Sequence, residues 1–202
     1  MSATKIKICG LFRPGDAEAV NKAGPDFAGL VFYEKSRRYI SPNRAEELRR
    51  LIAPAVATVG VFVDTEEMEI VRLYRRGVIS IAQLHGDEDR DYIKRLRDLQ
   101  PALAIWQAYS VRSRQDIEQA AASPADVVLL DNGYGTGRCF DWTLIGHLPR
   151  PFILAGGITP ENITEAITRF HPYALDMSSG VESAGVKDGK KIAAVVAEVR
   201  RS

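Results

Sequence analysis

Cys9, near the start of the sequence, is the candidate for a catalytic base. It follows residues 5–8, where polar and apolar residues alternate as in a short strand, and Gly10 comes next. A thiolate is an effective base when nearby positive charge lowers the pKa of the thiol, and Arg38 in a later basic loop could provide that charge. The alternative is a buried structural cysteine, because free cysteines are among the most buried residues.

Other polar side chains also stand where apolar segments end: Gln83, His85, Gln107, Asp131 and Asp176. A carboxylic acid at Asp131 could donate a proton if apolar surroundings raise its pKa. His85 could contact a substrate or could be the base in place of Cys9. Taken singly, Asp131 could cap a loop and His85 could be a structural histidine. Their shared position predicts one site, in which a proton leaves one substrate atom while another atom receives one, as in an isomerase.

Glycine and serine gather after two later apolar segments, as Gly156-Gly157 and Ser178-Ser179-Gly180. Glycine lets backbone N–H groups approach an anion closely, and a serine hydroxyl can donate as well. These segments therefore predict a phosphate-binding site. The glycine-rich stretch 133–137 matches no cofactor fingerprint, and we interpret it as a mobile lid.

The segments that must position these residues alternate between strand and helix patterns. The predicted strands are 5–8, 27–32, 56–63, 79–84, 103–109, 127–131, 152–155 and 173–177. The predicted helices include one opened by Ser41-Pro42, a short one near 142–147, one begun by Thr159-Pro160 and a last one with its apolar stripe over 192–199. About eight such units predict an α/β protein with one domain over 1–202, a closed (β/α)8 TIM barrel. An open doubly wound sheet is the main alternative.

Composition excludes several classes of protein. The 202 residues are 46% hydrophobic and 26% charged, as in an ordinary globular protein. The 27 basic and 26 acidic residues are mixed along the chain, so the charge pattern predicts no surface for nucleic acid or membrane. The two cysteines, Cys9 and Cys139, have no metal-ligand spacing, so neither a disulfide framework nor a metal site is expected. No apolar run approaches the length of a membrane span, and we expect a cytoplasmic protein.

An ordered set of motifs runs through the whole chain: 7–10 (KICG), 32–39 with Ser36-Arg37-Arg38-Tyr39, 83–86 (QLHG), Leu130-Asp131, 135–137 with 140–142, 156–158 (GGI) and 178–182 (SSGVE). In these motifs the chain resembles the phosphoribosylanthranilate isomerase family of tryptophan biosynthesis. The resemblance implies an Amadori rearrangement of N-(5-phosphoribosyl)anthranilate to 1-(2-carboxyphenylamino)-1-deoxyribulose 5-phosphate. It also implies a reaction without a cofactor.

The resemblance assigns a role to each matching position. Cys9 matches the general base that removes the C2 proton, and Asp131 matches the general acid that protonates the ring oxygen. Arg38 matches the arginine that helps to hold the substrate. The remaining matches are residues that line the pocket, Gln83 and His85, and residues of the phosphate-binding loops, Gly156, Gly157, Ser179 and Gly180.

Two loop positions depart from the family pattern and bear on loop shape and affinity. Glu34 stands where members often have an uncharged residue, and 183–186 replaces a more usual proline-glycine turn.

Two other functions are alternatives to this one. An epimerase on the same fold would require a metal site or a pair of acidic side chains on opposite sides of the substrate. A non-catalytic phosphate-binding scaffold would need neither Cys9 nor Asp131. The sequence leaves open whether the chain is a monomer or a homodimer.

Overall fold

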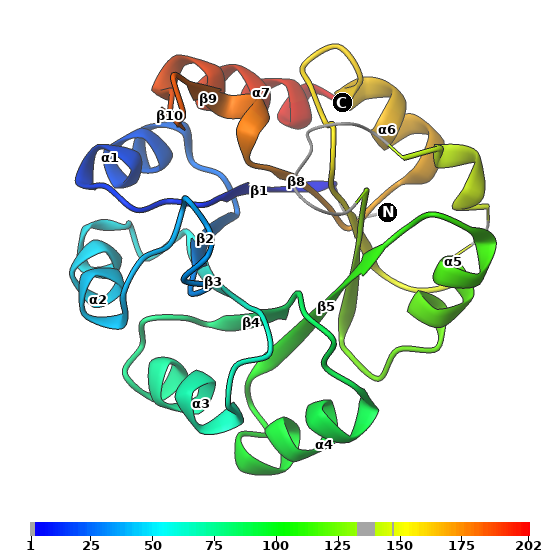
Figure 1. The fold of residues 1–202 in the computed structure, drawn as a ribbon. Coiled ribbons are helices and arrows are strands. Elements are labelled where there is room, and N and C mark those ends of the chain that lie inside the picture. The colour runs from blue at the N-terminus through cyan, green and yellow to red at the C-terminus, as the bar shows by residue number, and fades with distance from the viewer. Residues whose placement is uncertain (1–2, 133–139, 147) are drawn as a thin grey trace.

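Parallel strands form a closed barrel that is surrounded by helices, as Figure 1 shows in a view along the barrel. The computed structural model describes residues 3–132, 140–146 and 148–202. Within them the barrel strands are β1 (Lys5–Cys9), β2 (Phe27–Val31), β3 (Ala57–Phe62), β4 (Ile81–Leu84), β5 (Ala104–Ser110), β6 (Val127–Asp131), β7 (Phe152–Leu154) and β8 (Ala174–Met177). The helices are α1 (Pro14–Ala23), α2 (Pro42–Leu51), α3 (Glu67–Arg75), α4 (Arg90–Leu99), α5 (Arg114–Ala121), α6 (Ile163–Phe170) and α7 (Gly189–Arg201).

The first and last barrel strands pair with each other. Residues 5–8 of β1 lie in parallel register with residues 174–177 of β8, while β1 pairs with β2 on its other side. This pairing closes the sheet, so the predicted (β/α)8 barrel is confirmed and the open doubly wound sheet is wrong. Among the described helices, none is long and apolar enough to cross a bilayer.

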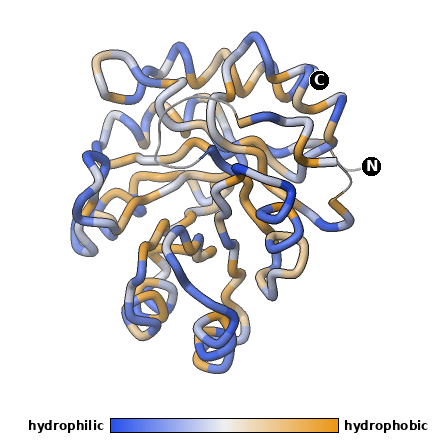
Figure 2. The backbone as a smooth tube through the Cα atoms, turned by 45° about the vertical axis from the view of Figure 1, so that its right-hand side comes forward, coloured by the Kyte–Doolittle hydropathy of each residue, from blue (hydrophilic) through white to orange (hydrophobic). Residues whose placement is uncertain are grey.

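Two apolar layers hold the barrel together. The larger lies between strands and helices, and Figure 2 shows hydrophobic strands inside a rim of helices with hydrophilic stretches. The smaller fills the inside of the barrel, where the Phe27 and Trp106 rings meet edge to face with centroids 5.0 Å apart and Tyr173 lies against both. Aromatic pairs of this kind add to the stabilisation from buried area. The lower part of the barrel is therefore packed, which leaves the other end for polar chemistry.

Strand β1 carries polar residues into the barrel. Ile6 and Ile8 belong to the layer under the helices, so Lys5, Lys7 and Cys9 point the opposite way, toward the barrel axis. Lys5 lies over the Tyr173 ring at 4.8 Å, and Lys7 one step further along is fully buried. The apolar residues of this alternating strand therefore face the helices. Its polar residues face the interior of the barrel and not the solvent.

Several predicted elements differ in detail. The segment predicted as a helix near 142–147 is a 3-10 turn over Trp142–Leu144 where it is described, because Asp141 accepts from Thr143 N at 2.9 Å and tightens it. The helix expected from Thr159-Pro160 begins at Ile163. Ser41 does precede α2, but its side chain makes no capping bond to any described residue. The predicted lid 133–137 lies outside the described residues.

A small hairpin follows β8, and no sequence pattern predicted it. A 3-10 turn over Ser179–Val181 leads into β9 (Glu182–Ser183), which pairs with β10 (Val186–Lys187). Ala184 and Gly185 join the two strands with φ of 50° and 79°. Strands of two residues have no periodicity to detect, so this element could only emerge from the fold.

Candidate active site

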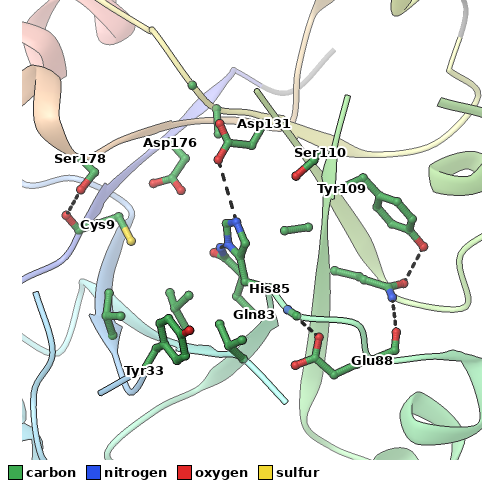
Figure 3. Close-up of a pocket in the computed structure, with 18 of the residues that line it drawn as sticks. Cys9, Tyr33, Gln83, His85, Glu88, Tyr109, Ser110, Asp131, Asp176 and Ser178 are labelled. Carbon is green, nitrogen blue, oxygen red and sulfur yellow. Dashed lines mark hydrogen bonds and ion pairs between the residues drawn. The ribbon is translucent and has the colours of Figure 1, made fainter. Parts of the chain in front are cut away.

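A cavity of about 1280 Å³ opens at the carboxyl ends of the strands. It is lined by all nine residues that the sequence predicted for the site: Cys9, Arg38, Gln83, His85, Asp131, Gly156, Gly157, Ser179 and Gly180. In a (β/α)8 barrel this end holds the active site in essentially every characterised enzyme. Figure 3 shows Cys9 and Asp131 reaching into the same space from different sides. His85 lies below Asp131 in this view, and a dashed line joins the two side chains.

Cys9 has a charged neighbour that sequence reasoning missed. The Lys7 ammonium lies 2.9 Å from Asp176 Oδ2 and is the cation that acts most on the Cys9 thiol. Burial raises the pKa of the thiol, while Lys7 opposes that rise and Asp176 adds to it. Burial also works against the Lys7 ammonium, but Asp176 and Cys9 raise the pKa of Lys7 overall, so the ammonium stays charged. The thiol therefore sits beside a permanent countercharge for its thiolate.

Local packing fixes the position of Cys9. Gly29 on the neighbouring strand makes room for the sulfur, because a Cβ at that position would lie 2.7 Å from Sγ. The backbone carbonyl of Cys9 accepts from Ser178 Oγ at 3.1 Å, which ties the end of β1 to the end of β8. The thiol is thus held at the floor of the cavity with little freedom.

His85 and Asp131 face each other across the cavity. His85 Nε2 lies 3.9 Å from Asp131 Oδ2, and His85 Nδ1 lies 3.2 Å from the Gln83 amide nitrogen. The ring therefore pairs with the Gln83 amide through Nδ1 and faces Asp131 through Nε2. Burial lowers the pKa of His85 although Asp131 opposes the effect, so the ring is neutral at pH 7. Asp131 Oδ1 accepts from Asn132 N at 2.7 Å, which fixes the carboxyl group.

The loop after β7 approaches Asp131 closely. Gly156 and Gly157 have φ of 74° and 70°, and a Cβ on Gly156 would overlap Asp131 Oδ1. The Asn162 amide donates to Gly157 O at 2.9 Å and holds the loop from behind. Across the cavity mouth Ser179 begins the 3-10 turn that contains Gly180. The two predicted anion-binding segments therefore border one cavity.

Arg38 lies at the cavity wall, but it is not among the groups that shift the pKa of Cys9 most. Its Nε and Nη2 donate to the carboxylate of Glu182 at 2.6 and 3.0 Å. Lys7 is the cation that lowers the thiol pKa most, with a smaller contribution from Lys187. The main countercharge is therefore Lys7, and the Arg38 guanidinium is paired with a buried carboxylate that the sequence pattern could not place.

Gln107 and Glu88 have a supporting role. Gln107 follows Trp106, which faces the barrel interior, so its side chain points away from the axis and donates to the backbone carbonyl of Glu88 at 2.8 Å. The Glu88 carboxylate accepts from Asp64 N at 2.9 Å and from Gly86 N at 2.8 Å. Burial raises the pKa of Glu88. These bonds stiffen the loop directly after His85 (Figure 3).

The barrel and the cavity at its mouth define a (β/α)8-barrel enzyme. Residues 6–198 match the family model described as N-(5'phosphoribosyl)anthranilate (PRA) isomerase. A relative named N-(5'-phosphoribosyl)anthranilate isomerase from Dechloromonas aromatica is 46% identical over 98% of this chain and 97% of its own length. The crystal structure of phosphoribosyl anthranilate isomerase from Thermus thermophilus has a TM-score of 0.87 at 34% identity, covering 98% of this chain and 99% of its own.

A further solved structure carries a ligand. It is a phosphoribosyl anthranilate isomerase in complex with reduced 1-(o-carboxyphenylamino)-1-deoxyribulose 5-phosphate, with a TM-score of 0.86 at 34% identity over 98% of this chain and 100% of that one. The chain belongs to the N-(5'-phosphoribosyl)anthranilate isomerase family. It is an isomerase of tryptophan biosynthesis.

Proposed function

We propose that the chain converts N-(5-phosphoribosyl)anthranilate to 1-(2-carboxyphenylamino)-1-deoxyribulose 5-phosphate, with Cys9 as general base and Asp131 as general acid. In this proposal a single domain, as a monomer or a homodimer in the cytoplasm, acts on a small phosphosugar without nucleic-acid or membrane partners. The observation that supports it most is that the thiol and the carboxyl group enter one cavity from β1 and β6, and that the two segments predicted to bind an anion line the same cavity. The reaction moves protons within one molecule, so it needs no cofactor.

The two ends of the substrate would bind on different walls. The phosphate would lie between Gly156-Gly157 and Ser179-Gly180, where backbone N–H groups and a hydroxyl can donate to its oxygens. The anthranilate carboxylate would be held by Arg38, whose planar guanidinium suits a carboxylate. The ligand of the solved relative carries both groups in its name, a carboxyphenyl ring and a phosphate.

The sugar hydroxyls would fall on two buried acceptors. Asp176 Oδ1 and Gln83 Oε1 have no hydrogen-bond partner among the described residues, and both residues line the cavity. An acceptor left buried without a donor destabilises the protein by about 1–3 kcal/mol. Hydroxyl donors of a bound sugar would remove that penalty, which favours a polyol ligand over a flat aromatic one at this depth.

The proton transfers follow from that placement. Asp131 gives a proton to the furanose oxygen, the C1–O bond breaks, and the nitrogen lone pair forms the iminium. The Cys9 thiolate then removes the C2 proton, and the electrons of that C–H bond flow toward the iminium to give the enolamine, which tautomerises to the aminoketose. Lys7 supports the base, since its ammonium faces the thiolate that must form.

His85 is less suited to be the base. Its Nδ1 pairs with the Gln83 side-chain amide at 3.2 Å, so one of the two ring nitrogens is occupied. We assign it instead to the orientation of Asp131, toward which Nε2 points at 3.9 Å.

The activity is tested by following the fluorescence of phosphoribosylanthranilate as it is consumed. Asp131→Asn keeps the shape of the side chain but cannot donate a carboxyl proton, so turnover should fall by about 10² to 10⁴, the usual share of general acid–base catalysis. The circular dichroism spectrum should match that of the parent. A folded Asp131→Asn variant with parental turnover would remove Asp131 from the reaction.

A further inference from the structure

Glu182 is a buried carboxylate that pairs with three basic side chains beside the cavity. Its side chain is only 5% exposed. Oε1 accepts from Arg38 Nε at 2.6 Å and from Lys187 Nζ at 2.8 Å, and Oε2 accepts from Arg38 Nη2 at 3.0 Å and from Arg37 Nη2 at 3.1 Å. Three basic side chains therefore share one carboxylate.

The hairpin after β8 holds Glu182 in place from its own side. Lys187 on β10 lies opposite Glu182 on β9, so the two side chains form a cross-strand ion pair. Lys187 Nζ also donates to Ser178 O at 2.9 Å, and Lys191 Nζ donates to Glu182 O at 2.7 Å. The carboxylate thus has a fixed position relative to the end of β8, independently of Arg38.

Arg38 is fixed by that carboxylate and by its own stem. A Cβ on Gly10 would overlap Arg38 Cδ, so the stem runs directly against the backbone next to Cys9. Nε and Nη2 are both used by Glu182, while Nη1 has no hydrogen-bond partner among the described residues. Because the guanidinium is planar and rigid, fixing two of its nitrogens fixes the direction of the third.

We propose that Glu182 is a positioning residue, which aligns the Arg38 guanidinium so that its remaining edge meets the carboxylate of the substrate. This inference rests on the proposed function, in which Arg38 binds that carboxylate. A buried ion pair by itself is weak evidence for stabilisation, since a well-packed apolar residue often does as well. Orientation, in contrast, requires an acceptor that engages Arg38 at two points, and Glu182 provides one.

Substitution of Glu182 should therefore affect substrate binding more than turnover. In Glu182→Gln the amide NH2 must face one of the donors, so Arg38 loses its two-point contact. We expect KM to rise about tenfold while kcat stays within about threefold, because Arg38 holds the substrate but takes no part in the proton transfers, and loss of uniform binding raises KM without lowering kcat. The matched control is Glu67→Gln, which removes a carboxylate from Arg95 at 2.7 Å on the surface and should leave both constants unchanged.

The decisive measurement is a double-mutant cycle on KM with Arg38→Lys, in the fluorescence assay. If Glu182 acts through Arg38, the double variant should have a KM within about twofold of the worse single variant. Multiplied effects, or a parental KM in Glu182→Gln, would overturn the inference. A parental KM in Arg38→Lys would instead overturn the role of Arg38 in the proposed function.

Loss of folding would not leave the question open. If circular dichroism shows Glu182→Gln to be unfolded, Glu182→Asp takes its place, because aspartate keeps the charge but is one methylene shorter. A raised KM with preserved kcat in Glu182→Asp supports the positioning role, and a parental KM contradicts it.

Discussion

Replacing Lys7 with methionine should destabilise the protein and make Cys9 a poorer base. The Lys7 ammonium lies 2.9 Å from Asp176 Oδ2, and the two side chains are 0% and 10% exposed. At an effective dielectric constant of about 20, unit charges at that separation attract by roughly 6 kcal/mol before desolvation is counted. Removing one partner of a buried pair typically destabilises a protein by about 3–5 kcal/mol, because the other charge remains buried and unpaired.

The second charge supplies the control. Asp176→Asn added to Lys7→Met removes the unpaired carboxylate, so most of the lost free energy of unfolding should return, and a urea-unfolding cycle should give a coupling of at least about 2 kcal/mol. Independent effects, with the two single losses adding within about 0.5 kcal/mol, would refute this view of the pair.

The same variant reports on the thiol. In a Cys139→Ser background Cys9 is the only cysteine in the chain, so its alkylation by iodoacetamide can be followed against pH. Burial raises the pKa of Cys9 and Lys7 opposes the rise, so Lys7→Met should move the alkylation profile to higher pH. An unchanged profile in a folded variant would show that Lys7 does not stabilise the thiolate.

Three further predictions concern the loops around the site. Ala184 has φ of 50°, a region that asparagine tolerates better than alanine, so Ala184→Asn should raise the free energy of unfolding in urea by about 0.5–1 kcal/mol, and any loss would contradict the strain. The pKa of Glu182 is about 2 because the Arg38 and Lys187 bonds outweigh burial. Its contribution to stability is therefore present above pH 4.5 and is lost as the pH falls toward 2. Urea midpoints at pH 6 and pH 3 should show a smaller acid loss in Glu182→Gln than in the parent, and equal losses would contradict the assignment. Inorganic phosphate or sulfate should compete with the substrate, and EDTA should leave activity intact. Activity that disappears with EDTA and returns with a divalent ion would contradict the cofactor-free mechanism.

The sequence predicted the strands well because each has a clear local signal. Phe27–Val31 and Val127–Asp131 are nearly continuous apolar runs that end at glycine, proline or polar residues, as strands covered on both faces should be. The strand-helix rhythm then limited the topology to a barrel or an open sheet. Closure itself depends on β1 pairing with β8, a contact between chain ends that no local pattern encodes.

The sequence predicted the site residues that stand at the ends of strands. It did not predict the residues whose role depends on partners far away in the chain. Cys9 and Asp131 stand at such ends and line the cavity. Lys7 could not be identified from the sequence, because the alternation does not say which face of the strand becomes the barrel interior. Glu182 gains its partners from loops about 145 residues apart in the chain, so its pairing with Arg37 and Arg38 becomes visible only in three dimensions.

The most direct test of the proposed mechanism is a comparison of turnover in Cys9→Ser and His85→Asn. A serine hydroxyl hardly ionises near neutrality, so Cys9→Ser should lose about 10² to 10⁴ in kcat while it keeps its circular dichroism spectrum and its affinity for inorganic phosphate. His85→Asn should lose less, because in this account His85 orients Asp131 and takes no proton. A Cys9→Ser enzyme that turns over at the parental rate, beside a folded but inactive His85→Asn, would contradict the account and make His85 the base.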